Sequence, residues 1–280
     1  MDGVGLTSLW VAAMRAVESE RGQDALVRDP FARALAGDEG FDILERGKGT
    51  TAFDLPVIPI RTKWIDERVA ATKADQIVIL AAGMDARAFR LDLHDKKVFE
   101  VDRDFVLAYK RERIAAPARC DRVEVPVDLR DDWPSALATA GRGRGATESA
   151  GFDASRETMW LVEGLLVYLE AAHVRSLLER IDAISAKGSE LVFETNNRAL
   201  LTSPIMQARM AFVRDLGAPW VFGVDDPTTL VPKGWDSTVT DFAKVGTDYG
   251  RWPFPVAPND LSPAVLATIP RTFLVHATKL

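Results

Sequence analysis

Short apolar runs recur through the middle of the chain. They lie at residues 76–81, 97–101, 122–127, 158–163 and 190–194. A strand that helices cover on both faces needs apolar side chains on both sides, so these runs predict strands of a parallel sheet. Segments with apolar residues at helical spacing lie between them, as at 105–115 and 171–186. The alternation predicts one doubly wound α/β sheet with right-handed crossovers.

The N-terminal part of the chain has a helical pattern rather than a strand pattern. Apolar residues recur at helical spacing over 7–20, and Asp29 followed by Pro30 is typical of the start of a second helix. A third helix is expected over 61–71. Residues 36–60 are expected to be irregular, because their prolines exclude a central strand.

The pattern is looser in the C-terminal part of the chain. A long helix is expected over 199–216, a short helix near 227–231, and strands near 237–240 and over 272–278. The two added strands bring the expected sheet to seven strands, most of them parallel. The polar, glycine-rich segment 140–156 is expected to be a mobile surface loop.

Composition and charge exclude some classes of partner. Apolar residues make up 47% of the chain and charged residues 27%, the balance of a soluble globular protein. The net charge of -6 disfavours nucleic acid as the main partner. The longest apolar stretch, 159–169, is too short to span a bilayer, and the N-terminus lacks a signal-peptide pattern. Because the single cysteine, Cys120, suits a reducing compartment, we expect a cytoplasmic protein without nucleic-acid or membrane partners.

Small or acidic residues stand where the predicted strands end, which is where open α/β sheets bind ligands. Gly83 follows the first strand and allows a ligand to approach the backbone closely. Asp102 comes 19 residues later, near the spacing expected of an acid that accepts ribose hydroxyls. Asp128 and the backbone of Leu129 follow the third strand and could meet an adenine ring. Glu163 ends the fourth strand, where the reactive end of a ligand is expected.

Each of these residues also has an explanation without a ligand. Gly83 could serve only the backbone angle of its turn, Asp102 could cap the next helix, and Asp128 could be an ordinary turn residue. Arg61, a further candidate at the start of the helix expected over 61–71, could be a solvated helix residue. Glu163 is hardest to explain in this way, because an acid inside an apolar strand costs free energy unless it has a partner.

Seven segments between residues 7 and 169 form a recognisable set. They are Thr7–Ala13, Arg28–Ala32, Arg61–Asp66, Ala82–Leu91, Glu100–Asp102, Val127–Leu129 and Glu163–Leu169. Together they resemble the leucine carboxyl methyltransferase-like superfamily, and within it the bacterial S-adenosylmethionine-dependent methyltransferases that are common in actinomycetes. The resemblance implies a Rossmann-like class I methyltransferase fold with S-adenosyl-L-methionine as cofactor.

The resemblance also implies roles for the candidate residues. Arg61 would hold the carboxylate of the cofactor's methionine part, Gly83 would be the close-approach glycine, and Asp102 would bind the ribose.

The remaining implied contacts lie at the two ends of the cofactor. Asp128 with Leu129 would bind the adenine, and Glu163 would face the methionine amino group or support the site. Asp85 and Arg87 would brace the turn after the first strand. The turn departs from the family at Ala81, where relatives often have glycine.

The methyl acceptor is expected to be a small molecule that offers a carboxylate or a hydroxyl oxygen. A carboxylate needs no base, whereas a hydroxyl would want one, and His173 is the histidine expected nearest the site. No metal-ligand cluster is visible in the sequence, and no catalytic residue is assigned. We expect residues 1–30 and 199–260 to form the acceptor pocket. Their aromatic residues, which could instead belong to the core, are Trp10, Trp220, Phe222 and Trp235.

We predict a single domain over residues 1–280. It would consist of an N-terminal helical cap at 1–72, a cofactor-binding core at 73–198, and an acceptor-side insertion with closing strands at 199–280. One alternative is an NAD(P)-dependent Rossmann oxidoreductase, although alanines replace two glycines of the dinucleotide fingerprint. The other is a scaffold that binds the cofactor without turnover. The sequence does not indicate the oligomeric state.

Overall fold

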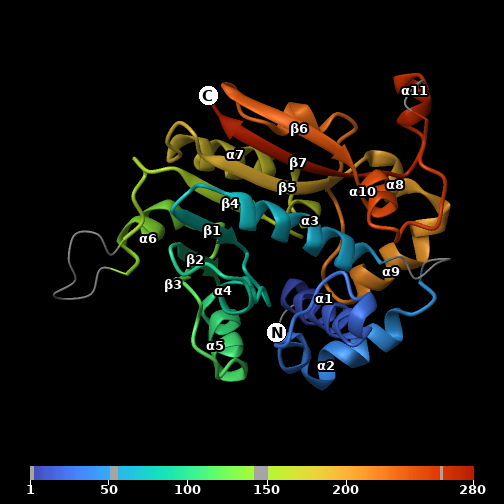
Figure 1. The fold of residues 1–280 in the computed structure, drawn as a ribbon. Helices are drawn as coiled ribbons and strands as arrows, with labels where there is room; N and C mark the ends of the chain where they lie inside the picture. The colour runs from blue at the N-terminus through green and yellow to red at the C-terminus, as the bar shows by residue number, and fades with distance from the viewer. Residues whose placement is uncertain (1–2, 51–55, 142–150, 259–260) are drawn as a thin grey trace.

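The computed structural model describes residues 3–50, 56–141, 151–258 and 261–280. Its strands form one seven-stranded sheet in the order β3-β2-β1-β4-β5-β7-β6 (Figure 1). The first five strands are mutually parallel, and β7 is antiparallel to both β5 and β6. The strands are β1 Gln76–Leu80, β2 Lys97–Asp102, β3 Asp121–Pro126, β4 Thr158–Val162, β5 Glu190–Asn196, β6 Trp235–Asp241 and β7 Thr272–Lys279. The predicted Rossmann-like α/β class is confirmed.

Helices precede the sheet and connect its strands. The α-helices are α1 Gly3–Ser19, α2 Ala32–Gly47, α3 Val57–Ala71, α4 Arg87–Arg90, α5 Asp104–Arg113, α6 Trp133–Thr139, α7 Ala171–Ala183, α8 Arg198–Thr202, α9 Gln207–Asp215, α10 Phe242–Asp248 and α11 Pro263–Leu266. The short 3-10 turns are η1 Gly22–Asp24, η3 Leu166–Tyr168, η4 Pro204–Met206 and η5 Pro227–Leu230. None of the helices in the described ranges is long and apolar enough to cross a membrane.

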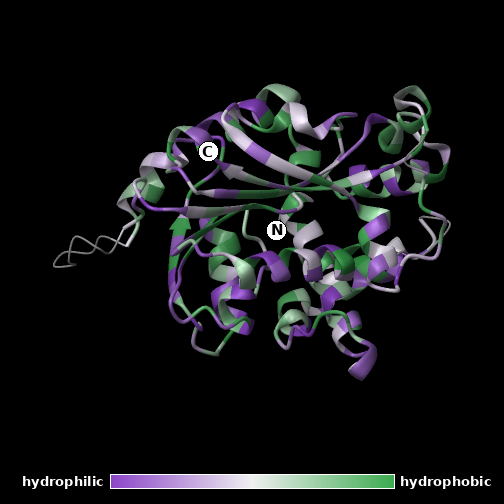
Figure 2. Cartoon of the chain, turned by 45° about the horizontal axis from the view of Figure 1, so that its top comes forward, coloured by the Kyte–Doolittle hydropathy of each residue, from purple (hydrophilic) through white to green (hydrophobic). Residues whose placement is uncertain are grey.

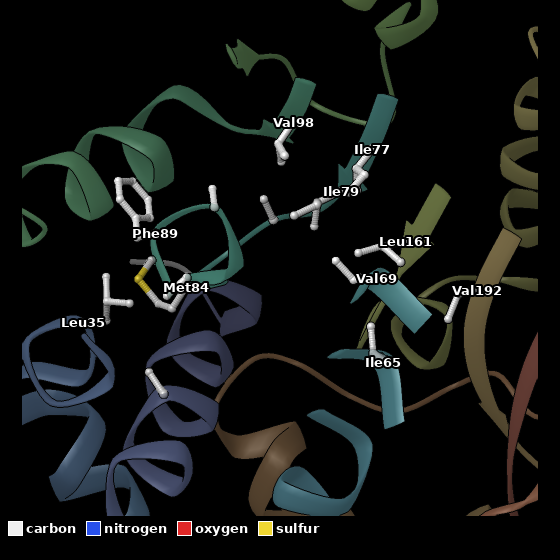
Figure 3. Close-up of a cluster of buried hydrophobic side chains, with 14 of the residues drawn as sticks. Leu35, Ile65, Val69, Ile77, Ile79, Met84, Phe89, Val98, Leu161 and Val192 are labelled. Atoms are coloured by element: carbon white, nitrogen blue, oxygen red, sulfur yellow. The ribbon is translucent and has the colours of Figure 1, made fainter. Parts of the chain in front are cut away.

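The central strands are buried on both faces, which explains their unbroken apolar runs. In β1, Ile77 and Ile79 pack into one core cluster together with Val69 of α3, as Figure 3 shows. Val78 and Leu80 point to the other face and pack into a second cluster, with side chains of α6 and α7. Figure 2 shows hydrophilic and hydrophobic residues alternating along the outer helices. Consecutive strand residues therefore serve two cores, as a sheet covered on both sides requires.

The expected irregularity of residues 36–60 is wrong for 36–47, because α2 continues to Gly47, and for 57–60, where α3 begins, while residues 51–55 lie outside the described residues. Gly37 has a φ of +56° and kinks the helix without ending it, and Leu35 and Ile43 are buried on either side of the kink. The prolines that suggested irregularity lie farther on, at the start of α3. There a missing backbone N–H costs little, since the first helical turn leaves its N–H groups unpaired in any case.

The long helix expected over 199–216 is also wrong. The structure divides it into α8, the 3-10 turn η4 and α9. Pro204 opens the 3-10 turn, since proline lacks the N–H that a continuous helix would need and its ring clashes with the preceding turn. Residues 142–150, the centre of the loop expected at 140–156, lie outside the described residues.

The helices α1 and α2 pack closely on one another beside the sheet (Figure 1). A Cβ atom on Gly40 of α2 would lie 2.6 Å from the carbonyl oxygen of Leu9 in α1, so glycine permits this approach. Leu35 of α2 in turn contacts the segment after β1, where it lies with Met84 and Phe89 (Figure 3). The N-terminal helices therefore cover the carboxyl end of β1.

Candidate functional site

The carboxyl ends of the five parallel strands, β1 to β5, open on one cavity of about 930 Å³. This volume is within the range of small-molecule sites, and the strand order reverses here between β1 and β4. All the candidate residues line this cavity, namely Arg61, Gly83, Asp102, Asp128, Leu129 and Glu163. The fold thus brings together side chains and backbone from α3 and from four strand ends.

The turn after β1 has an unusual backbone. Gly83 has a φ of +46°, and a Cβ atom added there would lie 3.1 Å from Cβ of Ser8 in α1. Ala81 has a φ of +54° and is the one non-glycine residue with a positive φ in the described ranges. Because an L-residue with a side chain disfavours this region, the turn is strained at Ala81. Alanine, where relatives often have glycine, therefore occupies a position whose backbone conformation favours glycine.

Asp102 joins the ends of β1 and β2. Its Oδ2 accepts from the N–H of Gly83 and its Oδ1 from the N–H of Arg103, both at 2.7 Å. Burial raises the pKa of Asp102, and the two backbone hydrogen bonds oppose that rise. The alternative of a helix cap fails, since no side chain caps the N-terminus of α5. Asp102 is buried at the cavity wall and does not point to bulk solvent.

Asp128 lines the cavity and is also a turn acid. Its Oδ1 accepts from the backbone N–H and from Nε of Arg130, each at 2.9 Å, while Oδ2 accepts from Nη2 at 2.7 Å. These hydrogen bonds lower the pKa of Asp128 to about 2, against a smaller effect of burial. The Arg130 side chain is 82% exposed, so it can move from this carboxylate at little cost.

Arg61 is not the solvated helix residue of the alternative explanation. Its side chain is only 12% exposed and reaches from α3 to the ends of two strands. Nε donates to Oε1 of Glu163 at 2.8 Å, and Nη1 donates to Oε1 of Glu194 at 3.0 Å. Burial lowers the pKa of Arg61, but the two carboxylates outweigh it and raise the pKa above its ordinary value.

Glu163 is fully engaged by two arginines. Its Oε1 meets Arg61, and its Oε2 accepts from Nη1 of Arg87 at 2.7 Å. Burial raises the pKa of Glu163, yet Arg87 and Arg61 lower it to about 2. The carboxylate is therefore ionised at neutral pH, and its oxygens anchor the two guanidinium groups.

Arg87 braces the turn after β1, as the sequence predicts with Asp85. It is hydrogen-bonded to Asp85, and its Nε donates to Oδ1 of Asp66 in α3 at 2.7 Å. A buried ion pair lies behind this turn: Nζ of Lys110 is 2.8 Å from Oε2 of Glu100 and donates to the carbonyl oxygen of Asp85 at 3.1 Å. These contacts connect the turn to α3 and α5.

Glu194 is a site residue that the sequence reasoning missed. It lies in the last part of β5, lines the cavity, and accepts through Oε1 from the N–H of Gly164 at 2.5 Å as well as from Arg61. The signal was present, since Glu194 ends the apolar run 191–193 just as Glu163 ends its own. What the sequence lacks is the contact with Arg61, which is 133 residues away in the chain.

The wall of the cavity is mainly apolar. Trp10 and Trp220 line the cavity. Phe222 and Trp235 belong instead to the second core cluster, on the face of the sheet that α6 and α7 cover. The C-terminal segment adds Trp252, Phe254 and other lining residues that the sequence did not single out. Parts of both segments therefore line one cavity, and the expectation that residues 1–30 and 199–260 form the acceptor pocket stays a prediction.

No histidine is among the described residues that line the cavity. His173 is exposed at the start of α7 and does not line it, and His276 lies 2.7 Å from Glu190 at the opposite end of β5. Within the described ranges, no group of three or more His, Cys, Asp and Glu side chains is arranged to hold a metal ion.

Comparison with known families and sequences gives consistent matches. Residues 8–182 match the model of the leucine carboxyl methyltransferase family. A protein of Streptomyces coelicolor assigned as an S-adenosyl-L-methionine-dependent methyltransferase is 37% identical over 268 residues, 89% of each chain. A protein of Rhodococcus jostii with the same assignment is 38% identical over 283 residues, 93% of this chain and 92% of its own.

Comparison with solved structures supports the fold. A DUF574 family protein from Streptomyces avermitilis superposes with a TM-score of 0.61 and 16% identity, over 98% of this chain and 97% of its own. A protein from Thermobifida fusca described as a methyltransferase superposes with a TM-score of 0.60 and 19% identity, over 88% and 92%. At these identities the similarity concerns the architecture alone.

Proposed function

The chain belongs to the leucine carboxyl methyltransferase family, and on this premise we propose that it methylates a carboxylate or hydroxyl oxygen of a small molecule in the cavity at the strand ends. It is an S-adenosylmethionine-dependent methyltransferase. The observation that carries the proposal is that one cavity collects the strand-end acids, the turn glycine and Arg61 beside a largely apolar space.

The described residues fit the cofactor. A nucleoside needs acceptors for its hydroxyl and amino groups, and Asp102 and Asp128 offer them on neighbouring strand ends of one wall. A methionine part needs a counter-charge for its carboxylate, which Arg61 offers. Among the described residues, Nη2 of Arg61 has no hydrogen-bond partner, so this nitrogen is left for a ligand. When bound, S-adenosylmethionine supplies an electrophilic methyl group on its sulfonium sulfur.

The residues at the nucleoside end would act by hydrogen bonding and close approach. Asp102 would accept from the ribose hydroxyls, and Gly83 would let the backbone approach the ligand. Asp128, once Arg130 moves, would accept from the adenine amino group, while the backbone of Leu129 would meet a ring nitrogen. Because Asp102 also holds the N–H of Gly83, the ribose contact and the turn would be positioned together.

The residues at the methionine end would act by charge. Arg61 would bind the carboxylate. Glu163 would support Arg61 rather than meet the ligand, because two buried guanidinium groups already compensate its charge, whereas Asp102, among the described residues, accepts from backbone N–H groups alone. Buried ion pairs of this kind hold their members in fixed positions. The geometry thus favours the supporting role among the two that the sequence left open for Glu163.

Apolar residues of the cavity wall would hold the acceptor. Trp10 and Trp220 would exclude water and align the acceptor oxygen with the methyl group, the main requirement of an in-line displacement. No histidine or lysine is among the described residues that line the cavity. This wall suits an acceptor that is already anionic at neutral pH, such as a carboxylate, which needs no general base.

Calorimetry tests the cofactor assignment directly. We expect saturable binding of S-adenosylhomocysteine and no binding of NAD. Asp102→Asn should weaken S-adenosylhomocysteine binding about tenfold or more, because a charged acceptor is lost. Asp104→Asn, the same change two residues away on the exposed start of α5, is the matched control and should bind normally. Binding of NAD in place of S-adenosylhomocysteine would favour the oxidoreductase alternative.

Turnover tests the transfer itself. Incubation with methyl-labelled S-adenosylmethionine and a panel of apolar carboxylic acids and phenols should label an acceptor. Mild alkali then distinguishes the products, because it releases methanol from a methyl ester but not from a methyl ether. Cofactor binding without labelling of any acid, phenol or alcohol would favour the non-catalytic scaffold.

A further inference from the structure

Two carboxylates flank Arg61, and they differ in whether each of their oxygen atoms has a hydrogen-bond partner. Glu163 accepts from a guanidinium group at each oxygen, at 2.8 and 2.7 Å. Glu194 uses Oε1 alone, which takes both Arg61 and the N–H of Gly164. Its Oε2 is buried and has no hydrogen-bond partner among the described residues. Native proteins rarely leave a buried acceptor unpaired, so a donor from a ligand is the natural complement.

The charge balance around Arg61 also indicates that a ligand group binds beside Glu194. The ion pairs there form one cluster of three guanidinium groups and four carboxylates, so the described cluster has one uncompensated negative charge when all its members are ionised. Its members are Arg61, Arg87, Arg90, Asp66, Asp85, Glu163 and Glu194. Burial raises the pKa of Glu194, and Glu163 adds to this rise against the opposing effect of Arg61. A cationic group beside Glu194 would remove the imbalance.

We propose that Glu194 binds the α-ammonium group of the methionine part of S-adenosylmethionine. The inference rests on the proposed function, in which Arg61 binds the carboxylate of that same part. In an α-amino acid the carboxylate and the ammonium group share one carbon atom. A carboxylate on Arg61 therefore brings the ammonium group next to the acids that flank Arg61, and Glu194 is the one with an unpaired oxygen.

The side chain can present that oxygen without a change of fold. The last torsion of a glutamate is broad, so the carboxylate rotates at little cost. Glu194 lines the cavity and its side chain is 12% exposed, which gives it access to a ligand there. After this rotation, the oxygen turned toward Arg61 and Gly164 would still accept their hydrogen bonds.

A comparison of two ligands and two proteins tests the proposal. The ligands are S-adenosylhomocysteine and its analogue in which hydrogen replaces the amino group, each titrated by calorimetry. In the unaltered protein, loss of the amino group should weaken binding about tenfold or more, as expected for a charge-assisted hydrogen bond. In Glu194→Gln, both ligands should bind alike, with an affinity close to that of the analogue. Discrimination that persists in Glu194→Gln overturns the proposal.

Glu190→Gln is the matched control. It makes the same change in the same strand, on the same face, but at the opposite end, where Glu190 contacts His276 and does not line the cavity. This variant should keep the full discrimination between the two ligands. If Glu194→Gln does not fold, Glu194→Asp retains the charge but shortens its reach, and should lose most of the discrimination; full retention overturns the proposal.

The outcomes separate this inference from the proposed function. If the unaltered protein binds neither ligand, the assignment of the cavity fails and the role of Glu194 with it. If the unaltered protein binds S-adenosylhomocysteine and Glu194→Gln still favours the amino group, only the role of Glu194 fails. If Glu194→Gln keeps that preference but loses methyl transfer, Glu194 serves the acceptor instead, which also overturns the proposal.

Discussion

Among single residues, Ala81 has a backbone conformation that alanine disfavours. Its φ of +54° lies in the left-handed region, which costs an L-residue about 1–2 kcal/mol relative to glycine. We expect Ala81→Gly to stabilise the protein by about 1 kcal/mol, since relief of this strain outweighs the extra entropy of glycine in the unfolded chain. Thermal unfolding should show a rise of roughly 2 °C in Tm.

The neighbouring alanine provides the control for this effect. Ala82 is buried and has no positive φ, so Ala82→Gly adds unfolded-state entropy without relieving strain. Its Tm should fall by roughly 2 °C. Equal falls in both variants would show that Ala81 is not strained.

Glu163 should make folding stability depend on pH under acidic conditions. Its pKa is about 2 in the folded protein against 4.5 ordinarily, because Arg87 and Arg61 favour the ionised form over the opposing effect of burial. A lowered pKa contributes stability that is fully present above about pH 4.5 and is lost as the pH falls toward 2. Urea unfolding between pH 7 and pH 2 should show a shallower loss of stability for Glu163→Gln than for the unaltered protein. Parallel curves would contradict the assigned ion pairs.

At the level of helices and strands, the contact between α1 and α2 sets where the cavity wall lies. Gly40 has no room for a side chain, since a Cβ atom would lie 2.6 Å from the carbonyl oxygen of Leu9. Gly40→Ala should therefore force the two helices apart and destabilise the protein by about 2 kcal/mol, or roughly 4–8 °C in Tm. The variant should also bind S-adenosylhomocysteine more weakly, because α1 contributes to the cavity wall.

Glu39→Ala is the control for the helix contact. It introduces alanine at the neighbouring exposed position of α2, so it changes the helix but not its packing. Stability should stay within about 0.5 kcal/mol of the unaltered protein. A similar loss in both variants would assign the effect to helix propensity rather than to the close approach of α1.

For the molecule as a whole, the proposed function puts the nucleoside at the strand ends and the acceptor at an apolar end, to which the first helix and the C-terminal segments would contribute Trp10 and Trp220. Trp220→Ala should leave S-adenosylhomocysteine binding within about twofold, while raising KM for the acceptor about tenfold or more, because Trp220 lines the apolar end. Phe222→Ala, two residues away in the core, should instead lower stability by about 3–5 kcal/mol. Weaker cofactor binding in Trp220→Ala would place the cofactor across that end.

The division into a cap at 1–72, a core at 73–198 and an insertion with closing strands at 199–280 stays a prediction. The strands within it were predictable to within about two residues, because buried strands such as β1 and β4 are apolar along their whole length. The boundaries of α2 and α8 were not, because Gly37 is tolerated within α2 while Pro204 follows directly after the C-cap of α8.

The candidate site likewise contains residues that the sequence could predict and one that it could not. Gly83, Asp102, Asp128 and Glu163 could be found from the sequence, because each stands at the end of an apolar run and parallel strands end at one edge of a sheet. Glu194 stands at such an end as well and was missed. Its significance comes from Arg61, a contact across 133 residues that no local pattern encodes.

Apolar periodicity and turn residues were enough to specify the parallel sheet, the edge at which ligands bind and the acids along that edge, because these features depend on neighbours in the chain. Which oxygen is engaged and which is left for a ligand could be learned only from the folded arrangement. That outcome depends on how Arg61 and Arg87 distribute their hydrogen bonds among acids from four separate elements, and on which of those acids burial leaves without a partner. Such a distribution exists only once distant segments pack together.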